Sequence, residues 1–478
     1  MTRFPKPTLS RRSFLTTAAA GTALVGLPAA GQSGTALREV ALRAAPGRAR
    51  LAPEPHPETT AWCYNGVVPG PEIRVKQGER LRVIVENALD EETTVHWHGV
   101  RVPNAMDGVP HLTQSPIAPG DSFTYEFDAV DAGTFWYHPH QRSFEQVDRG
   151  LQGALVVEEP NPPRVDRDIV WVLDDWRLTS AAKISDDFQN FHDISHAGRL
   201  GNTVTINGRV PDLFPMRSGE RMRLRIINAA NARIFALDFE DHEPRVIALD
   251  GQPVAPHSPE GGLVVLGPAM RADIILDCHG GPGTRATVVD RAYRGDEYRV
   301  VDLAYGEGRL RDALPDWPVA LAPNPLAEPN IAKARRHEVT FTGGMMGGMV
   351  MREMGLDATG GMMGMMHDGS GIWLIDGKAA EGHVLDPFLT LERGASHILA
   401  MTNATAFPHP MHLHGHSFRV IRRNGAPTVH REWQDTVLMA PRERVEIAFV
   451  ANNPGDWMFH CHILEHQAAG MMGVVRVA

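Results

Sequence analysis

One stretch of sequence occurs in two close copies and decides the fold. Residues 78–88 read GERLRVIVENA, and residues 219–229 read GERMRLRIINA. A looser third copy starts at Gly394 and ends at Asn403, and in all three copies the asparagine stands nine positions after the glycine. Self-similarity of this kind indicates a duplicated structural unit. The copies start 141 positions apart (78 to 219) and 175 positions apart (219 to 394), which is the length of a β-sandwich domain with variable loops.

The rest of the chain has the pattern of strands and turns. Short runs of β-branched and aromatic residues alternate with Gly, Pro and Asn, and no long stretch has the period of an amphipathic helix. Three turn pairs typical of hairpins occur between apolar residues: Asn207-Gly208, Asp250-Gly251 and Asp376-Gly377. The sequence therefore predicts an all-β chain of three consecutive sandwich domains, at residues 36–160, 161–320 and 335–478.

Composition excludes several classes of protein. The chain has 478 residues, of which 43% are hydrophobic, so it is long enough for several domains with their own cores. The net charge is -10 and no run of Lys or Arg stands out, so we expect no nucleic-acid partner. Three cysteines, Cys63, Cys278 and Cys461, allow at most one disulfide, whereas 23 His and 20 Met are high counts whose positions matter.

The first 31 residues are predicted to be a signal peptide. Arg11-Arg12 stands before a short apolar run at 15–27, which is followed by small residues at 29–31. This pattern resembles a twin-arginine export signal, and neither this run nor any later one is long enough to span a membrane. Such signals export proteins that are already folded, which suits a protein with an inserted cofactor. We therefore expect a periplasmic protein that uses the twin-arginine export machinery and has no membrane span.

Histidines occur at matching places in the first and third domains. Nine and eleven positions after the repeat asparagine lie His96 and His98 in the first domain, and His412 and His414 in the third. The same offsets in the middle domain give a leucine and a phenylalanine, so no metal ligands are expected there. Residues i and i+2 of a strand point to one face, so each H-x-H pair presents two imidazoles side by side.

A second motif adds another pair of histidines to each of these domains. The stretch GTFWYHPH at 133–140 aligns with GDWMFHCH at 455–462. If the two domains face each other, their eight imidazoles converge on one cluster that neither domain could assemble alone. His460 and His462 flank Cys461, so an electron arriving at a metal ion bound by this thiolate reaches the cluster through one residue of covalent path.

The cysteine of the last motif indicates copper. Imidazole suits Cu, Zn, Fe and Ni, so the histidines alone do not choose the metal. A His₂Cys site with a weak axial Met is the ligand set of an electron-transfer copper. His409, Cys461, His466 and Met471 supply that set, and only the ten-residue spacing from the cysteine favours Met471 over its neighbour Met472.

Over its whole mature length the chain resembles the multicopper oxidases, the family of laccases and bacterial cuprous oxidases. Four motifs in family order carry the resemblance: HWHG at 96–99, HPH at 138–140, HPMHLHG at 409–415, and HCH at 460–462. It implies three cupredoxin-like Greek-key domains and four coppers per chain, namely one type 1, one type 2 and a type 3 pair. The implied type 2 ligands are His96 and His412, and the implied type 3 ligands are His98, His138, His140, His414, His460 and His462.

The resemblance implies a reaction in which the type 1 copper oxidises a reductant and the other three coppers reduce O₂ to water. Four coppers can store the four electrons that a one-electron donor delivers singly. Cleaving O₂ requires protons, and Asp107 matches the acidic residue that the family has there, although a carboxylate before glycine is also typical of a plain turn. Some family members place a second acid where this chain has Gln467, and Glu465 is the substitute candidate.

A methionine-rich segment at 345–366 bears on the reductant. Soft thioethers select Cu(I), so the segment is expected to gather cuprous ions, with Met351, Met354 and Glu381 as candidate ligands. The alternatives are a Gly/Met loop without ligands or an apolar lid over the type 1 site.

The favoured reductant is therefore cuprous ion, in copper tolerance, with a laccase-like oxidase of phenols or aromatic amines as the alternative. Dedicated cuprous oxidases have an Asp and a Met shortly before the first type 1 histidine, where this chain has Thr405 and Phe407. A copper-free structural protein or a copper-storage protein of the same fold is disfavoured, because every implied ligand position is filled. We expect the protein to be a monomer.

Overall fold

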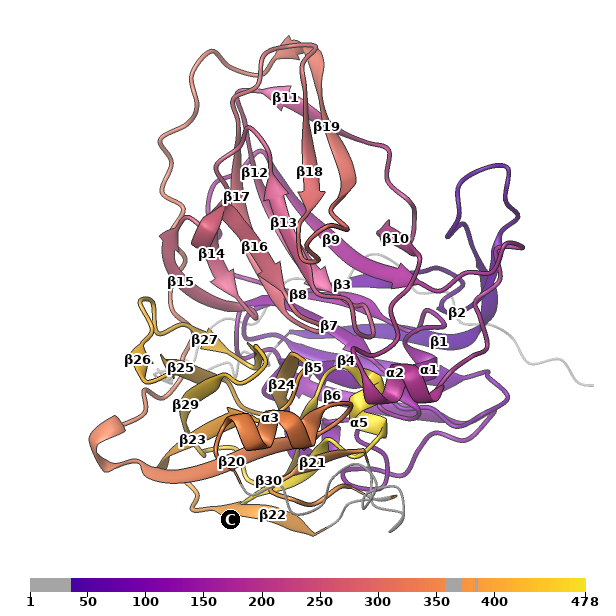
Figure 1. The fold of residues 1–478 in the computed structure, drawn as a ribbon. Coiled ribbons are helices and arrows are strands. Elements are labelled where there is room, and N and C mark those ends of the chain that lie inside the picture. Colours follow the sequence, from indigo (N-terminus) through magenta and orange to yellow (C-terminus); the bar gives the residue numbers. More distant parts are fainter. Residues whose placement is uncertain (1–35, 357–371, 381, 383–385) are drawn as a thin grey trace, which may run out of the picture. The chain divides into compact units, whose positions relative to one another are not determined.

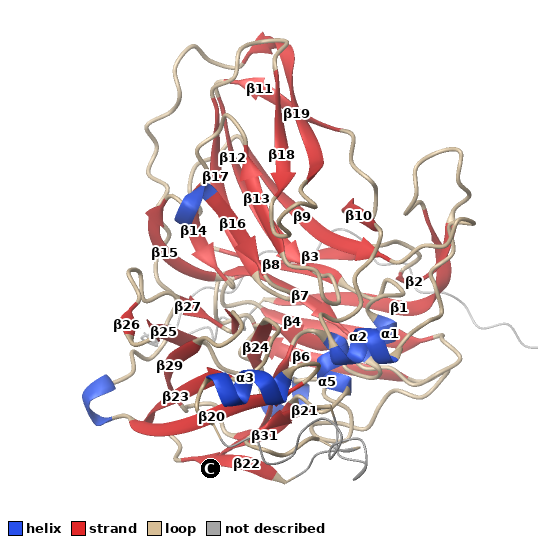
Figure 2. Ribbon diagram, viewed as in Figure 1, coloured by secondary structure: helices blue, strands red, loops and turns tan. Residues whose placement is uncertain are grey.

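The structure is a computed structural model that describes residues 36–356, 372–380, 382 and 386–478. The predicted signal peptide (1–31), part of the methionine-rich segment (357–366) and Glu381 lie outside the described residues. Strands dominate the described chain, and its helices are short (Figure 2). No helix among the described residues combines the length and the apolar character that crossing a bilayer requires.

The described strands form six sheets, two in each of three sandwiches (Figure 1). The first sandwich contains β1 (Leu37–Ala49), β2 (Thr59–Tyr64), β3 (Gly70–Lys76), β4 (Arg80–Asn87), β5 (His96–His98), β6 (Ser122–Asp128), β7 (Gly133–His138) and β8 (Gly153–Glu158). The second contains β9 (Arg167–Trp176), β10 (Thr203–Ile206), β11 (Leu213–Ser218), β12 (Glu220–Asn228), β13 (Phe235–Phe239), β14 (Arg245–Leu249), β15 (Gln252–His257), β16 (Leu263–Leu266), β17 (Arg271–Cys278), β18 (Arg285–Asp290) and β19 (Tyr298–Arg309).

The third sandwich contains β20 (Arg335–Gly343), β21 (Trp373–Ile375), β22 (Pro387–Leu391), β23 (Ser396–Asn403), β24 (His409–Leu413), β25 (Phe418–Arg423), β26 (Ala426–Pro427), β27 (Trp433–Gln434), β28 (Thr436–Met439), β29 (Arg444–Val450), β30 (Gly455–Cys461) and β31 (Met472–Val477). The described helices are α1 (Ser143–Gln146), α2 (Phe191–Ser195), α3 (Gly347–Glu353) and α5 (Leu464–Ala468), with short 3-10 turns at Asn104–Met106, Glu260–Gly262 and Ile331–Lys333.

The same strand order recurs in all three sandwiches. One sheet of each contains the order β3-β8-β7-β5, β11-β19-β18-β13 or β22-β31-β30-β24. In the opposite sheet, the repeat forms a central strand (β4, β12 or β23) that pairs in parallel with one neighbour and antiparallel with the other. The prediction of an all-β chain of repeated sandwiches is confirmed.

The glycine and the asparagine of the repeat bound this central strand. The glycines have φ values of 87°, 79° and 77° at Gly78, Gly219 and Gly394, a left-handed turn that favours glycine. Each asparagine is fully buried; its Nδ2 donates to two backbone carbonyls, and its Oδ1 accepts the N–H two residues on, at Asn87, Asn228 and Asn403. The repeat therefore encodes the turn into the strand and the loop that leaves it.

The sandwich interiors explain why the middle domain lacks a metal site. Leu237 and Phe239, which stand where the other domains have histidines, are buried in the apolar core between the two sheets of the second sandwich. In the first and third sandwiches the equivalent strands, β5 and β24, carry histidines instead, and β7 and β30 pair with them so that His96 lies opposite His138 and His412 opposite His460. The topology thus places two histidine-bearing strands side by side in each outer domain.

Candidate metal centre

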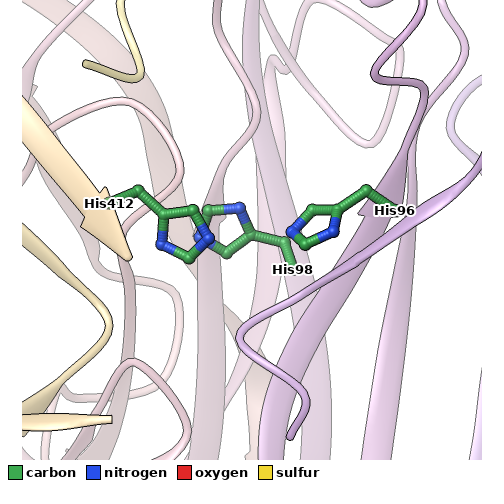
Figure 3. A group of neighbouring side chains, drawn as sticks. All are labelled: His96, His98 and His412. Atoms are coloured by element: carbon green, nitrogen blue, oxygen red, sulfur yellow. The ribbon is translucent and has the colours of Figure 1, made fainter. Parts of the chain in front are cut away.

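Eight histidines from the first and third sandwiches meet in one buried cluster. Rings from different domains stack closely, with centroid distances of 3.8 Å for His98 and His412 and 3.9 Å for His96 and His414. Figure 3 shows His98 lying between His412 of β24 and His96 of β5. All eight rings are buried, so the side chains that the two motifs predicted converge at the contact between the two domains.

The eight rings sort into three groups whose ligand atoms lie within 4.8 Å of one another. These groups are His96, His98 and His412; His98, His138 and His462; and His140, His414 and His460. Each group takes residues from both domains, so neither domain holds a complete group. The six predicted type 3 histidines fall into the last two groups, and the predicted type 2 pair falls in the first.

Backbone carbonyls orient several of these rings. Nδ1–H of His96 donates to the carbonyl of Asp107 (2.7 Å), and Nδ1–H of His412 donates to that of Asp435 (2.9 Å). His460 donates in the same way to the carbonyl of Cys461 at 2.8 Å. A donor bond at Nδ1 fixes the tautomer and leaves Nε2 with the lone pair that binds a metal.

The unpartnered nitrogens of the cluster fit metal ions. Among the described residues, buried ring nitrogens without a hydrogen-bond partner include Nε2 of His96, His140 and His412 and Nδ1 of His98 and His462. A buried polar atom without a partner is costly unless something binds it. Burial, reinforced by neighbouring imidazoles, lowers the pKa of the cluster histidines His98, His138, His140, His414, His460 and His462 well below 6.5. Neutral imidazoles are the form that coordinates metals.

The second group of ligands surrounds Cys461. Sγ of Cys461 lies 3.4 Å from Nδ1 of His409 and 3.8 Å from Nδ1 of His466, and all three side chains are fully buried. Their other ring nitrogens are held: Nε2 of His409 by the Thr405 hydroxyl (2.9 Å) and Nε2 of His466 by the His196 carbonyl (2.7 Å). Both histidines therefore present Nδ1 to the sulfur.

The two adjacent methionines face different surroundings. Met471 is fully buried in the apolar cluster that contains Cys461, whereas Met472 is half-buried and lines the cavity beside His140. Met471 therefore shares the buried surroundings of Cys461, and its role as axial ligand stays a prediction.

The whole chain is similar to known multicopper oxidases. Models of multicopper oxidase domains match residues 47–162, 167–292 and 360–478. The chain is 33% identical to multicopper oxidase MmcO of Mycobacterium tuberculosis, over 98% of this chain and 96% of that protein. The chain belongs to the multicopper oxidase family. It is therefore a copper-dependent oxidoreductase that uses O₂.

Two further relatives of this oxidase differ in what their names say. Laccase-1 of Botryotinia fuckeliana is 28% identical, over 85% of this chain and 77% of that protein. A solved structure described as a metallo-oxidase, the multicopper oxidase from Campylobacter jejuni, is 27% identical with a TM-score of 0.76, over 94% of this chain and 93% of that one. The chain is thus about equally similar in sequence to a relative named as a laccase and to one described as a metallo-oxidase.

Asp107 reaches the histidine cluster of the oxidase from the loop after β5. Its Oδ2 accepts from Nδ1 of His414 (2.9 Å), which lies in the other domain, and its Oδ1 lies 3.3 Å from Nδ1 of His96. Oδ1 is buried and has no hydrogen-bond partner among the described residues. The carboxylate is therefore placed at the cluster, with one of its oxygens in contact with a cluster histidine and without a hydrogen bond.

Asp435 is a second carboxylate at the cluster that sequence reasoning missed. Its Oδ1 lies 3.1 Å from Nε2 of His98, and the Arg271 guanidinium of the middle domain binds both of its oxygens at 2.6 and 2.8 Å. This cation keeps the pKa of Asp435 below its usual value, whereas burial and the nearby charge of Asp435 raise the pKa of Asp250. The middle domain thus supports a cluster to which it contributes no ligand, and no motif marks these residues.

A cavity of about 280 Å³ opens beside the cluster. His140 and Gln467 line it, and Nε2 of Gln467 lies 3.4 Å from Nδ1 of His140 while its Oε1 accepts from the Ser143 hydroxyl (3.2 Å). The cavity therefore contains a neutral amide where some family members have an acid. Glu465, the substitute candidate, is fully buried and points elsewhere: its oxygens accept from Asn231 Nδ2 and the Arg199 N–H.

The remaining predicted residues lie apart from the cluster. Met351 and Met354 lie in and just after α3, half-buried. His416, which has no predicted ligand role, is buried against Trp457. Cys63 and Cys278 are buried free thiols.

Proposed function

We propose that this oxidase uses cuprous ion as its reductant, in copper tolerance, and holds four coppers. Type 1 would be held by His409, Cys461, His466 and Met471; type 2 by His96 and His412; and the type 3 pair by His98, His138, His140, His414, His460 and His462. When bound, these coppers would supply four one-electron redox centres, the number that reducing O₂ to two waters requires. One observation carries the function: Cys461 of one ligand group sits between His460 and His462 of the other.

Residues of the chain perform the remaining tasks. The backbone from Cys461 to its two neighbours joins the cysteine site to the cluster, so the electron path needs no additional group. Asp107 would supply protons for the reduction of O₂, because its Oδ1 lies at the cluster and has no hydrogen-bond partner among the described residues.

The surroundings of His466 support a metal ion rather than a bulky phenol. His466 is fully buried, and its Nε2, the ring edge away from the sulfur, is bonded to the His196 carbonyl. A phenol therefore has no direct contact with this ligand, whereas a metal ion bound at the surface can donate its electron through the protein. The methionine-rich segment and the similarity to a metallo-oxidase also support cuprous ion.

A laccase-like activity is the second candidate. It is favoured by Thr405 and Phe407, which replace the Asp and Met of dedicated cuprous oxidases, and by the similarity to a laccase. In the structure the Thr405 hydroxyl instead holds His409, so this position is used to orient a ligand.

Steady-state kinetics tests the choice of reductant. We expect kcat/KM for Cu(I), measured by O₂ uptake, to exceed kcat/KM for a phenolic donor, with and without added cupric ion. A higher value for the phenol would identify a laccase. Four coppers per chain by elemental analysis and a blue absorption band are expected of the loaded protein, and a well-metallated sample with far fewer coppers contradicts the proposed ligand sets.

We propose that the protein is exported to the periplasm by the twin-arginine route, which residues 1–31 support. Replacing Arg11 and Arg12 together with lysine should leave the protein in the cytoplasm, whereas Arg3→Lys should not; equal export of both variants contradicts the route. The monomeric state stays a prediction, which light scattering can check.

A further inference from the structure

We propose that His192 and His196 bind the cuprous ion that the oxidase consumes, and that His196 hands its electron to His466. This site deepens the proposed function and rests on it. The two histidines lie on and just after α2, in a part of the middle domain to which no metal role has been assigned here.

The two imidazoles form a pair at the surface. They stand four positions apart, and their rings stack with centroids 4.4 Å apart at 10°. The His192 side chain is 78% exposed, and the half-buried His196 ring also meets the edge of Phe407 at 5.7 Å. Imidazole is a good ligand for copper, and an exposed pair can turn to share one ion.

Hydrogen bonds fix the tautomer of His196, the inner ring of the pair. Ser195 Oγ donates to the Phe191 carbonyl (2.6 Å), so it can only accept from Nδ1–H of His196 (2.9 Å). The same Nδ1–H also lies 3.1 Å from the His192 carbonyl. These contacts place the proton of His196 on Nδ1 and leave Nε2 with the lone pair that a metal ion requires.

The methionine-rich segment begins next to the pair. The backbone N–H of Met345 donates to the Ser195 carbonyl (2.8 Å), which joins the start of α3 to the end of α2. The first methionines of this segment, Met346 and Met349, are 50% and 43% exposed. Soft sulfur donors favour Cu(I) over Cu(II), so a thioether of this segment that joined the two imidazoles would make the site bind the substrate better than the product.

A short path leads from this pair to the ligands of the cysteine site. The His196 carbonyl accepts from Nε2–H of His466 at 2.7 Å, and Nδ1 of His466 faces Cys461 Sγ at 3.8 Å. Trp373 holds the helix in place, because its Nε1 donates to the Ile194 carbonyl (2.7 Å) while its ring packs on His466 at 4.2 Å. An electron from an ion on the His196 ring thus crosses one residue and one hydrogen bond.

The proposed step is balanced in electrons and protons. Each cuprous ion bound by the pair loses one electron and leaves as cupric ion. Four such ions supply the four electrons, and the solvent supplies the four protons, that convert one O₂ into two waters. No bond within the protein forms or breaks.

Silver(I) binding to the copper-loaded enzyme tests the site, because Ag(I) mimics Cu(I) but cannot be oxidised by O₂. We expect titration calorimetry to show that the double variant His192→Ala/His196→Ala loses one equivalent of bound Ag(I) relative to the unmodified enzyme. The matched control is His257→Ala/His430→Ala, a pair whose rings also stack, at 3.8 Å and 21°, and which should keep that equivalent. Retention of Ag(I) by the first variant overturns the proposal.

Kinetics with Cu(I) gives a second readout. His192→Ala alone, at an exposed position that folding does not depend on, should raise KM for Cu(I) about tenfold or more while the blue band is kept. An unchanged KM overturns the site and leaves the cuprous oxidase function intact. Failure of the proposed function itself looks different, because the unmodified enzyme would then oxidise a phenol but not Cu(I).

Discussion

At the scale of single residues, Cys461 joins the two ligand groups of the oxidase. It is fully buried, and burial raises the pKa of its thiol far above the usual value. Copper binds the thiolate, so loading this site must displace a proton from the thiol. The other two cysteines belong to none of the metal-binding groups found among the described residues. Burial raises the pKa of Cys63 to about 11, and burial is also the main cause that raises the pKa of Cys278 to about 12.

Replacing Cys461 with serine should abolish the blue band and turnover. The hydroxyl has nearly the volume of the thiol, so the apo-protein should still fold, with an unchanged circular dichroism spectrum. Cys278→Ser is the matched control, because it alters a buried thiol far from any histidine group and should keep the colour. Turnover in the Cys461 variant would refute the assignment.

Replacing Asp107 with asparagine should separate proton delivery from electron entry. The amide oxygen can still accept from Nδ1–H of His414, but the side chain no longer takes up a proton. We expect turnover to fall about a hundredfold, while anaerobic reduction by the substrate still bleaches the blue band. Asp90→Asn, at an exposed position, should behave like the unmodified enzyme. Equal turnover in the two variants means that Asp107 is only a turn residue.

At the scale of elements, the central strand of each sandwich depends on the asparagine that ends it. In the middle domain Asn228 donates to the carbonyls of Arg233 and Leu266 and accepts from the Ala230 N–H. The equivalent Asn403 does more: its Oδ1 accepts from the Thr405 hydroxyl, which in turn holds His409. The structural unit of the third domain thus also orients a predicted copper ligand.

Asn228→Ala should destabilise the protein without removing copper ligands. Three buried hydrogen bonds at about 1 kcal/mol each predict a loss of about 3 kcal/mol in the free energy of unfolding, measured with urea. Asn452→Ala, at an exposed position, should cost little. A loss of copper in the folded Asn228 variant would contradict a purely structural role.

At the scale of the whole molecule, charged residues of the middle domain support the cluster between the outer two. Arg271 binds Asp435, and Asp250 accepts from the backbone N–H groups of Asp435 and Thr436. All of these side chains are buried. Removing one partner of a buried ion pair leaves an uncompensated charge, which costs more than the pair itself contributes.

Arg271→Leu should therefore lower the free energy of unfolding by about 3 to 5 kcal/mol and reduce the copper held by the histidine cluster. Arg291→Ala is the control, because Arg291 makes solvent-exposed ion pairs with Asp238 and Glu240, and its loss should leave the free energy of unfolding nearly unchanged. Equal destabilisation by both substitutions would show that the ion pair of Arg271 with Asp435 does not stabilise the contact between the domains.

The buried histidines predict how the stability of the copper-free protein depends on pH. Burial lowers the pKa of His466 to about 3 and that of His416 to about 4. It also lowers the pKa of six cluster histidines: His98, His138, His140, His414, His460 and His462. Below pH 6.5 the unfolded chain takes up protons at these side chains and the folded chain does not, so their contribution to stability is full above pH 6.5 and is lost as pH falls. Each such histidine contributes a slope of up to about 1.4 kcal/mol per pH unit.

Buried carboxyls act in the opposite direction but are fewer. Burial raises the pKa of Asp148 to about 6 and that of Glu465 to about 7, so these groups favour the folded state as pH falls from 7 towards 4. We expect a net loss of stability of the copper-free protein from pH 7 to pH 5, measured by urea unfolding at each pH. A constant or rising stability would mean that the histidines are not buried as neutral rings.

The fold, and which histidines and cysteine gather in the two groups, could be predicted because their signals are local. The glycine and asparagine of the repeat act within one strand and its adjoining loops, and an H-x-H pair shares a face wherever a strand forms. Cys461 stands between two histidines in the chain itself. The three-domain architecture and every proposed copper ligand can therefore be proposed from the sequence alone.

Contacts between domains could not be predicted in the same way. Arg271 and Asp435 are 164 positions apart, and the His196 carbonyl and His466 are 270 apart. No motif marks Arg271, Asp435 or His196. The packing of the sandwiches decides which histidines of the first domain meet which of the third. It also decides that residues of the middle domain bind Asp435 beside the cluster and cover His466. Packing is the sum of many weak contacts between distant residues, and no single segment of the chain carries it.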